Sequence, residues 1–124
     1  MIPHYKNIHN RFKINDFHFD KEALYQLAYT LIKEGKDYEN DLGVFLLDWL
    51  DDKETIQLTT SGTTGAPKVI TIKKQSMVHS AIATGNFFNL HPQDKALLCL
   101  PARYIAGKMM IVRAMMLGLE LDIM

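Results

Sequence analysis

Residues 55–73, TIQLTTSGTTGAPKVITIK, decide how the second half of this chain folds. The β-branched and apolar runs 55–60 and 69–72 each predict a strand. Between them, residues 61–68 combine glycines and a proline with hydroxyl residues, which is typical of a loop. The stretch therefore predicts two strands joined by a loop that is rich in hydrogen-bond donors.

This loop has the composition of a polyphosphate-binding site, although Ser, Thr and Gly are also common in ordinary turns. Gly62 and Gly65 allow a tight turn and let a ligand approach the backbone without a Cβ in the way. Consecutive backbone N–H groups can then converge on an anion. A Walker loop is excluded, because its lysine leads into a helix and Lys68 leads into a strand. The side-chain donors and the cation are Thr60, Ser61, Thr63, Thr64 and Lys68.

Downstream of the loop, helices and strands are predicted to alternate. Residues 74–90 and 103–117 show helical patterns, which we expect Pro92 and Gly118 to end. Residues 95–101 form a continuous apolar run typical of a buried parallel strand, and residues 119–124 begin another strand. This order predicts an α/β fold built from βα units around a parallel or mixed sheet.

Upstream of residue 55, the chain predicts two amphipathic helices and little else. Residues 21–34 follow Asp20, a good N-terminal cap, and we expect Gly35 to end the helix in the left-handed conformation. Residues 39–51 predict the second helix, whereas residues 1–19 show no regular periodicity. We therefore interpret residues 1–124 as part of one domain, with a helical lead-in (1–54) and a segment with the loop and βα units (55–124).

Composition excludes several classes of protein. The chain has 124 residues with 14 Lys and Arg, 14 Asp and Glu and zero net charge, so no basic excess favours nucleic acid. No apolar run is long enough for a membrane span. A single cysteine, Cys99, and a start unlike a secretory signal predict a cytoplasmic protein. We expect Cys99 to be buried and inert. His4, His9 and His18 match no zinc spacing.

Residues 60–68, TSGTTGAPK, resemble the phosphate-binding signature of the AMP-forming acyl-CoA synthetases, the adenylate-forming superfamily. The signature reads Thr/Ser-Ser-Gly-Thr-Thr-Gly-x-Pro-Lys and usually continues with glycine, where this chain has Val69. The strand and helix order after the loop also resembles that family. Its phosphate loop normally lies further from the N-terminus, so we expect the sequence to be an N-terminal fragment of a larger ligase that lacks part of the usual sheet.

Within that family, the stretch 98–124 most resembles the o-succinylbenzoate–CoA ligases of the menaquinone pathway. Leu100-Pro101 and Ile105-Ala106-Gly107 fit their pattern, and Tyr104 stands where they usually have histidine. The resemblance makes Tyr104 and Gly107 candidates for binding the acid.

The resemblance implies a reaction in which a carboxylate attacks the α-phosphate of ATP and pyrophosphate leaves. The thiolate of coenzyme A then displaces AMP. In this interpretation the loop hydroxyls, Gly62, Gly65 and Lys68 hold the phosphates, and Mg²⁺ accompanies ATP. The adenine, ribose, metal and catalytic lysine motifs of the family lie beyond residue 124, so we expect the chain alone to be inactive. A fatty acyl-CoA synthetase, another acyl-adenylating enzyme and a non-catalytic phosphate-binding fragment remain alternatives, and the oligomeric state is left open.

The helix predicted for residues 103–117 is rich in methionine and invites two interpretations. Met109, Met110, Met115 and Met116 either pack in the core or line a pocket for a flat aromatic acid. Lys108 and Arg113 interrupt its apolar surface. We expect solvent-facing or snorkelling side chains there, the alternative being attraction of substrate carboxylates.

Overall fold

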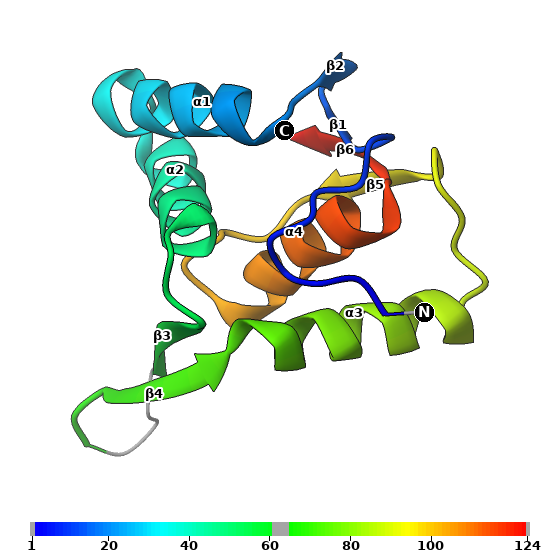
Figure 1. The fold of residues 1–124 in the computed structure, drawn as a ribbon. Helices are drawn as coiled ribbons and strands as arrows, with labels where there is room; N and C mark the ends of the chain where they lie inside the picture. The colour runs from blue at the N-terminus through cyan, green and yellow to red at the C-terminus, as the bar shows by residue number, and fades with distance from the viewer. Residues whose placement is uncertain (1, 61–64, 124) are drawn as a thin grey trace.

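The computed structural model describes residues 2–60 and 65–123 (Figure 1). Four helices and a set of short strands follow one another along this part of the chain. The helices are α1 (Lys21–Glu34), α2 (Asp37–Leu50), α3 (Lys74–Phe87) and α4 (Ile105–Leu117). The strands are β1 (Lys13–Ile14), β2 (Phe17–His18), β3 (Thr55–Thr60), β4 (Lys68–Lys73), β5 (Lys95–Leu98) and β6 (Glu120–Ile123).

A mixed sheet with the strand order β2-β1-β6-β5 confirms the predicted α/β class. Strands β5 and β6 are parallel neighbours joined through α4, which makes one βαβ unit. Strand β1 lies parallel to β6 on its other side, and β2 runs antiparallel to β1. The mixed character of the sheet therefore comes from the N-terminal strands.

The two strands around the predicted loop form a separate antiparallel hairpin. Thr55 pairs with Lys73 at its root, and Thr60 pairs with Lys68 next to the loop. In Figure 1 this hairpin projects below α2, and β4 continues directly into α3. Both strands are confirmed, but in the described part of the chain they pair only with each other and do not join the mixed sheet.

Residues 1–19, where the sequence predicts little regular structure, contribute β1 and β2. Asn15 and Asp16 turn the chain between these strands with φ values of 47° and 71°, which suits the tight turn of a two-residue hairpin. The strands have two residues each, too few to show a pattern in the sequence. Tertiary pairing with β6 stabilises them instead.

The helix ends follow the predictions in part. The Asp20 side chain accepts a hydrogen bond from the Ala23 N–H at 2.8 Å, as expected of a cap. The left-handed conformation expected for Gly35 is wrong, because its φ is −81°; an added Cβ there would lie 2.6 Å from the Glu39 Cβ, so lack of space favours glycine. Helix α3 ends at Phe87, well before Pro92, and Asn89 reverses the chain with a φ of 55°.

Helix α4 lies at the centre of the core and confirms the packing interpretation of its methionines. Met109, Met115 and Met116 are buried, and Gly118 ends the helix in the left-handed conformation with a φ of 75°. The N-terminal segment lies across α3 and α4 (Figure 1), where the His9 N–H donates to the Met115 carbonyl at 2.8 Å.

The fully buried strand predicted for residues 95–101 is wrong in one respect. Leu97 and Leu100 are about half exposed, and Cys99 is exposed rather than buried. Strand β5 lies at the edge of the mixed sheet, where the described residues pair with it on one side only, and it ends at Leu98, so Cys99 and Leu100 lie in the segment after it.

Candidate functional site

The hairpin β3–β4 holds the two ends of the predicted phosphate loop. Ser61, Gly62, Thr63 and Thr64 lie outside the described residues. Thr60 and Lys68, the residues next to them in the strands, are cross-strand partners, so the chain leaves and re-enters the hairpin at adjacent points.

Gly65 carries the turn at the described end of the loop. Its φ of 103° is one that side chains with a Cβ rarely adopt, although an added Cβ would meet nothing within 4 Å. Glycine is therefore favoured there by backbone conformation, unlike at Gly35, and Gly65 and Lys68 both remain exposed to solvent.

Tyr104 immediately precedes α4, in a turn that follows β5. Its N–H donates to the Pro101 carbonyl at 3.2 Å, and its own carbonyl accepts from the Lys108 N–H at 3.0 Å. Its ring is half exposed, and the Arg103 guanidinium carbon lies 5.3 Å from the ring centroid. A cation at this distance is favourably placed against an aromatic face.

A hollow of about 360 Å³ brings Tyr104 together with the strands that carry the loop. This volume is at the small end of the range for ligand pockets. Aliphatic side chains of β3, β4 and α4 form most of its walls, and a tyrosine and an arginine lie beside them. We call it the acid hollow, and its lining residues are Leu58, Thr59, Ile70, Ile72, Arg103, Tyr104 and Ile105.

A second hollow, of about 250 Å³, shares Thr59 and Arg103 with the acid hollow and has several charged residues in its lining. Its charged residues are Asp41, Asp48 and Lys108 in addition to Arg103. The Arg103 Nε lies 3.6 Å from an Asp41 carboxylate oxygen. Partial burial, with a smaller effect of Asp51, raises the pKa of Asp48 above its ordinary value, and Lys108 opposes this shift.

Lys108 is buried, which corrects the expectation of a solvent-facing or snorkelling side chain. Its Nζ donates to the Ala102 carbonyl and lies 5.8 Å from the centroid of the Phe45 ring. Burial lowers the pKa of Lys108, and the nearby carboxylates of Asp41 and Asp48 partly offset that effect. A lysine in an apolar helix does not reveal, from the sequence alone, that its ammonium donates to a buried carbonyl.

Gly107 lies in the first turn of α4 and packs against the preceding turn. A Cβ at this position would overlap the Pro101 carbonyl and lie 2.8 Å from the Leu100 carbonyl oxygen. Glycine therefore lets α4 start close to the turn that carries Tyr104. Gly107 does not line either hollow that the structure describes.

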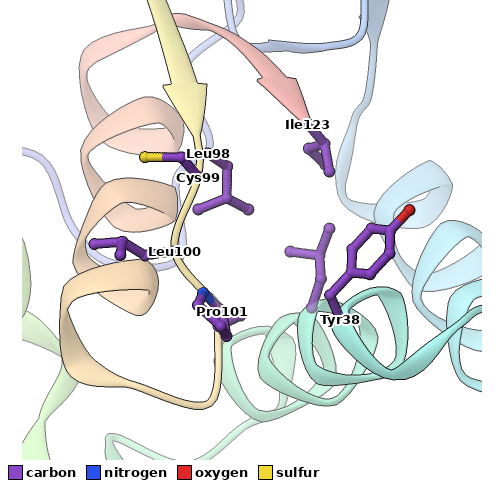
Figure 2. Close-up of a pocket in the computed structure, with 8 residues that line it drawn as sticks. Tyr38, Leu98, Cys99, Leu100, Pro101 and Ile123 are labelled. Carbon is purple, nitrogen blue, oxygen red and sulfur yellow. The ribbon is translucent and has the colours of Figure 1, made fainter.

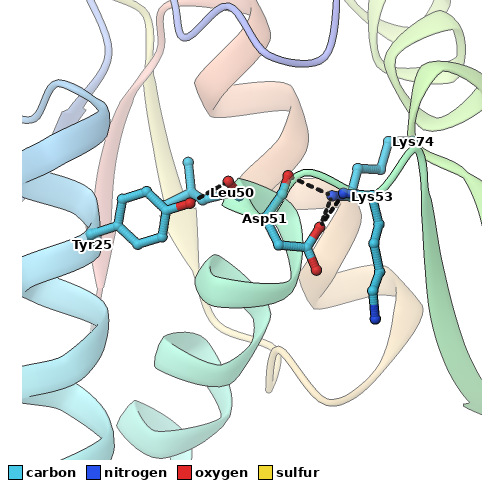
Figure 3. Close-up of polar contacts among 5 residues, drawn as sticks. All are labelled: Tyr25, Leu50, Asp51, Lys53 and Lys74. Atoms are coloured by element: carbon cyan, nitrogen blue, oxygen red, sulfur yellow. Dashed lines mark hydrogen bonds and ion pairs between the residues drawn. The ribbon is translucent and has the colours of Figure 1, made fainter.

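A half-buried ion pair, which the sequence interpretation missed, fixes the root of the hairpin (Figure 3). The Nζ of Lys74, a fully buried side chain, donates to the Asp51 carboxylate at 2.7 Å. The same carboxylate oxygen accepts the Lys53 N–H at 2.9 Å, and the Lys74 N–H donates to the Glu54 carbonyl at 2.9 Å. These bonds join the end of α2 to both strands of the hairpin and to the start of α3.

This ion pair also lowers the pKa of the Asp51 carboxyl. Partial burial alone would raise the pKa of its carboxyl, but hydrogen bonds from Lys74 and from the Lys53 N–H hold that pKa below its ordinary value. On the other side of α2, the Tyr25 hydroxyl donates to the Leu50 carbonyl (Figure 3), and burial, together with Asp52 and Asp51, raises the pKa of Tyr25.

A further cavity of about 270 Å³ lies between α2 and the carboxyl ends of β5 and β6 (Figure 2). Tyr38 faces it from α2, and Ile123 faces it from β6. Its lining is largely apolar, and among the described residues it includes neither Lys68 nor Tyr104.

In residues 2–60 and 65–123, no group of three or more His, Cys, Asp or Glu side chains could hold a metal ion. None of the helices in that part of the chain combines the length and apolar character that crossing a membrane requires.

Comparison with known proteins places this geometry in context. Residues 29–124 match the family model described as AMP-binding enzyme. Among solved structures, an acyl-CoA synthetase (AMP-forming)/AMP-acid ligase II-like protein from Dyadobacter fermentans DSM 18053 is similar to this chain, with 38% sequence identity and a TM-score of 0.67. That match covers 81% of this chain and 29% of the relative, so the chain spans less than a third of the relative's length.

A second solved structure matches more weakly. The Vibrio cholerae adenylation domain AlmE, solved in complex with glycyl-adenosine-5'-phosphate, has 21% identity and a TM-score of 0.49 over 65% of this chain and 16% of its own. No curated protein matches the sequence.

Proposed function

The chain belongs to the AMP-binding enzyme family, and on that basis we propose that it carries the phosphate-binding part of an ATP-dependent acid–CoA ligase. The match covers 29% of the Dyadobacter relative, so we propose the activity for a whole protein that contains this sequence. The division into a lead-in (1–54) and a segment with the loop (55–124) is part of the same proposal.

One observation carries the proposal: the hairpin that holds the phosphate loop also forms walls of the acid hollow. Leu58 and Ile70 are cross-strand partners in that hairpin, and both line the hollow that contains Tyr104. The same two strands would therefore position both reactants: the phosphates beyond Thr60 and Lys68, and the acid beside Tyr104. Positioning two reactants on one rigid element is a large part of catalysis in group transfer.

The proposed reaction has two steps. A carboxylate oxygen of the acid attacks the α-phosphorus of ATP, and the bond from that phosphorus to the pyrophosphate oxygen breaks. The thiolate sulfur of coenzyme A then attacks the carbonyl carbon of the acyl-adenylate, and AMP leaves with the carbon–oxygen bond electrons. The acid, ATP and coenzyme A are thus the proposed partners.

The loop's proposed task is to hold the phosphates while negative charge builds on the leaving pyrophosphate. Mg²⁺ bound with ATP would add positive charge there. The part of this task that we propose for the chain itself is carried by its own donors. These are the hydroxyls of Thr60, Ser61, Thr63 and Thr64, the backbone at Gly62 and Gly65, and the Lys68 ammonium.

We propose that the acid is o-succinylbenzoate and that the reaction belongs to the menaquinone pathway. We also propose that the protein acts in the cytoplasm. The aliphatic walls of the acid hollow and the adjacent Tyr104 ring suit a flat apolar body, and the Arg103 guanidinium suits a carboxylate. Tyr104 is the proposed contact, whereas Gly107 would act by letting α4 start close to Tyr104's turn.

Acid-dependent exchange of radiolabelled pyrophosphate into ATP tests this function on the whole protein. The panel contains o-succinylbenzoate, benzoate and fatty acids of increasing length, followed by an assay for the CoA thioester. We expect exchange with o-succinylbenzoate. Exchange only with fatty acids would identify a fatty acyl-CoA synthetase, and binding of ATP without exchange for any acid would identify a non-catalytic phosphate-binding protein.

A further inference from the structure

The turn that carries Arg103 and Tyr104 is held from the inside of the molecule by Lys108. The Nζ of Lys108 donates to the carbonyl of Ala102, a residue that is 2% exposed. The Lys108 N–H donates to the Tyr104 carbonyl at 3.0 Å. Lys108 thus contacts both ends of the segment 102–104 with two different donors.

The surroundings of the Lys108 ammonium show what the side chain contributes. Among the described residues, no carboxylate lies within ion-pair distance of its Nζ. Burying an ammonium without such a partner is unfavourable, and an apolar side chain of similar size would avoid that cost. What an apolar side chain cannot supply is a donor for the buried Ala102 carbonyl.

The position of this turn matters for the acid hollow. Arg103 and Tyr104 line that hollow together. From the other side, Arg103 makes a long contact with Asp41, at 3.6 Å, and its side chain is largely exposed. The buried bond from Lys108 is therefore the stronger constraint on where the turn places these two side chains.

We propose that Lys108 is a positioning residue: its hydrogen bond to Ala102 fixes the turn that presents Arg103 and Tyr104 to the acid. That Lys108 fixes the turn does not depend on the protein having any enzymatic activity. That the turn affects acid binding rests on the function proposed above. Lys108 touches neither reactant, and its effect passes through the turn.

The test compares Lys108→Met with Lys108→Arg in the whole protein, with Lys95→Met as an exposed-lysine control. The first measurement is amide hydrogen exchange at Tyr104, in the turn, and at Gly118, at the other end of α4. In Lys108→Met we expect exchange at Tyr104 to be about tenfold faster, because the turn opens locally. We expect Gly118 to change by less than about twofold, because global stability is largely kept. The arginine variant, which retains a donor, and the control should resemble the wild type.

The second measurement separates the two substrates. In Lys108→Met we expect the KM for the acid to rise about tenfold while the KM for ATP stays within about twofold, since misplacing the turn affects only the acid. Lys108→Arg should restore the acid KM at least in part. If Lys108→Met fails to fold, Lys108→Leu, which also lacks a hydrogen-bond donor, takes its place in both measurements.

The outcomes separate this inference from the proposed function. An unchanged exchange rate at Tyr104 in Lys108→Met overturns the inference. An equal acceleration of exchange at Tyr104 and Gly118 also overturns it, because it would indicate a loss of global stability. Faster exchange at Tyr104 with a normal acid KM overturns the half that concerns acid binding. Faster exchange in a protein that activates no acid at all supports the positioning of the turn and contradicts the proposed function.

Discussion

Lysines show how unevenly single residues of the candidate site could be predicted. Lys68 is recognisable because the loop composition around it indicates phosphate binding. Lys108 and Lys74 are not, because what defines each is a hydrogen-bond partner that only the packed fold brings to it: the Ala102 carbonyl for one and the Asp51 carboxylate for the other. Lys74 follows Lys73 in the sequence, a pair typical of a surface. Burial of a lysine depends on the packed fold, which no local pattern reveals.

Lys68→Ala is expected to weaken the use of ATP more than the binding of acid. The Lys68 ammonium stands at the exit of the loop, where the proposed pyrophosphate carries its charge, whereas the acid hollow is lined by other residues. We expect the KM for ATP to rise about tenfold or more, since a charged hydrogen bond to phosphate is lost, with the KM for the acid nearly unchanged. Steady-state kinetics with each substrate varied in turn measure this, and Thr63→Ala should act in the same direction.

Lys73→Ala is the matched control for that variant. Lys73 is an exposed lysine at the far end of the same strand, where it pairs with Thr55 at the root of the hairpin. We expect kinetics close to the wild type. The assignment of Lys68 to the phosphates is refuted by equal effects of the two variants, or by a change in the acid KM alone.

Secondary structure elements could be predicted where a local signal exists. Asp20 and the apolar spacing after it predicted α1, and the β-branched runs predicted β3 and β4. The sequence did not reveal that β3 and β4 form their own sheet, because pairing partners are chosen by tertiary packing. For the same reason it missed β1 and β2, whose two-residue strands exist only through pairing with β6 and with each other.

Asp51→Asn should destabilise the junction between α2, the hairpin and α3 in a pH-dependent way. The pKa of Asp51 in the folded protein is lowered, so its charge stabilises the fold above the unfolded pKa of about 3.9. That contribution is lost as the pH falls through the folded pKa, which lies lower still. We expect the variant to be about 1 kcal/mol less stable near pH 6, a modest value because the carboxylate is partly exposed and screened.

Urea denaturation between pH 6 and pH 2 measures this difference. The gap between wild type and Asp51→Asn should narrow below about pH 4, where the wild-type carboxyl also becomes neutral. Asp52→Asn, which changes the exposed neighbouring carboxylate, should leave stability within about 0.5 kcal/mol throughout. A gap that stays constant with pH would mean that the ion pair with Lys74 is not the source of the stabilisation.

At the scale of the whole molecule, the N-terminal segment ties the two halves of the chain together. Tyr5 packs its ring against Trp49 in α2, at 6.4 Å between centroids, and its N–H donates to Gln75 in α3 at 3.0 Å. Beyond it, β1 lies beside β6 in the mixed sheet. The lead-in and the segment with the loop are therefore distinct in sequence pattern yet share one core.

Phe12→Ala tests whether this shared core unfolds as one unit. The Phe12 side chain is 1% exposed, just before β1, so its removal leaves a cavity that costs about 3–5 kcal/mol. Phe17→Ala, in the next strand and 69% exposed, should cost less than about 0.5 kcal/mol. The fluorescence of Trp49, the chain's one tryptophan, reports on α2. If unfolding is cooperative, the unfolding transition followed by Trp49 fluorescence must show the whole loss of unfolding free energy caused by Phe12→Ala. If Phe12→Ala leaves the transition followed by Trp49 fluorescence unchanged but shifts the transition followed by circular dichroism, the N-terminal segment folds independently of α2.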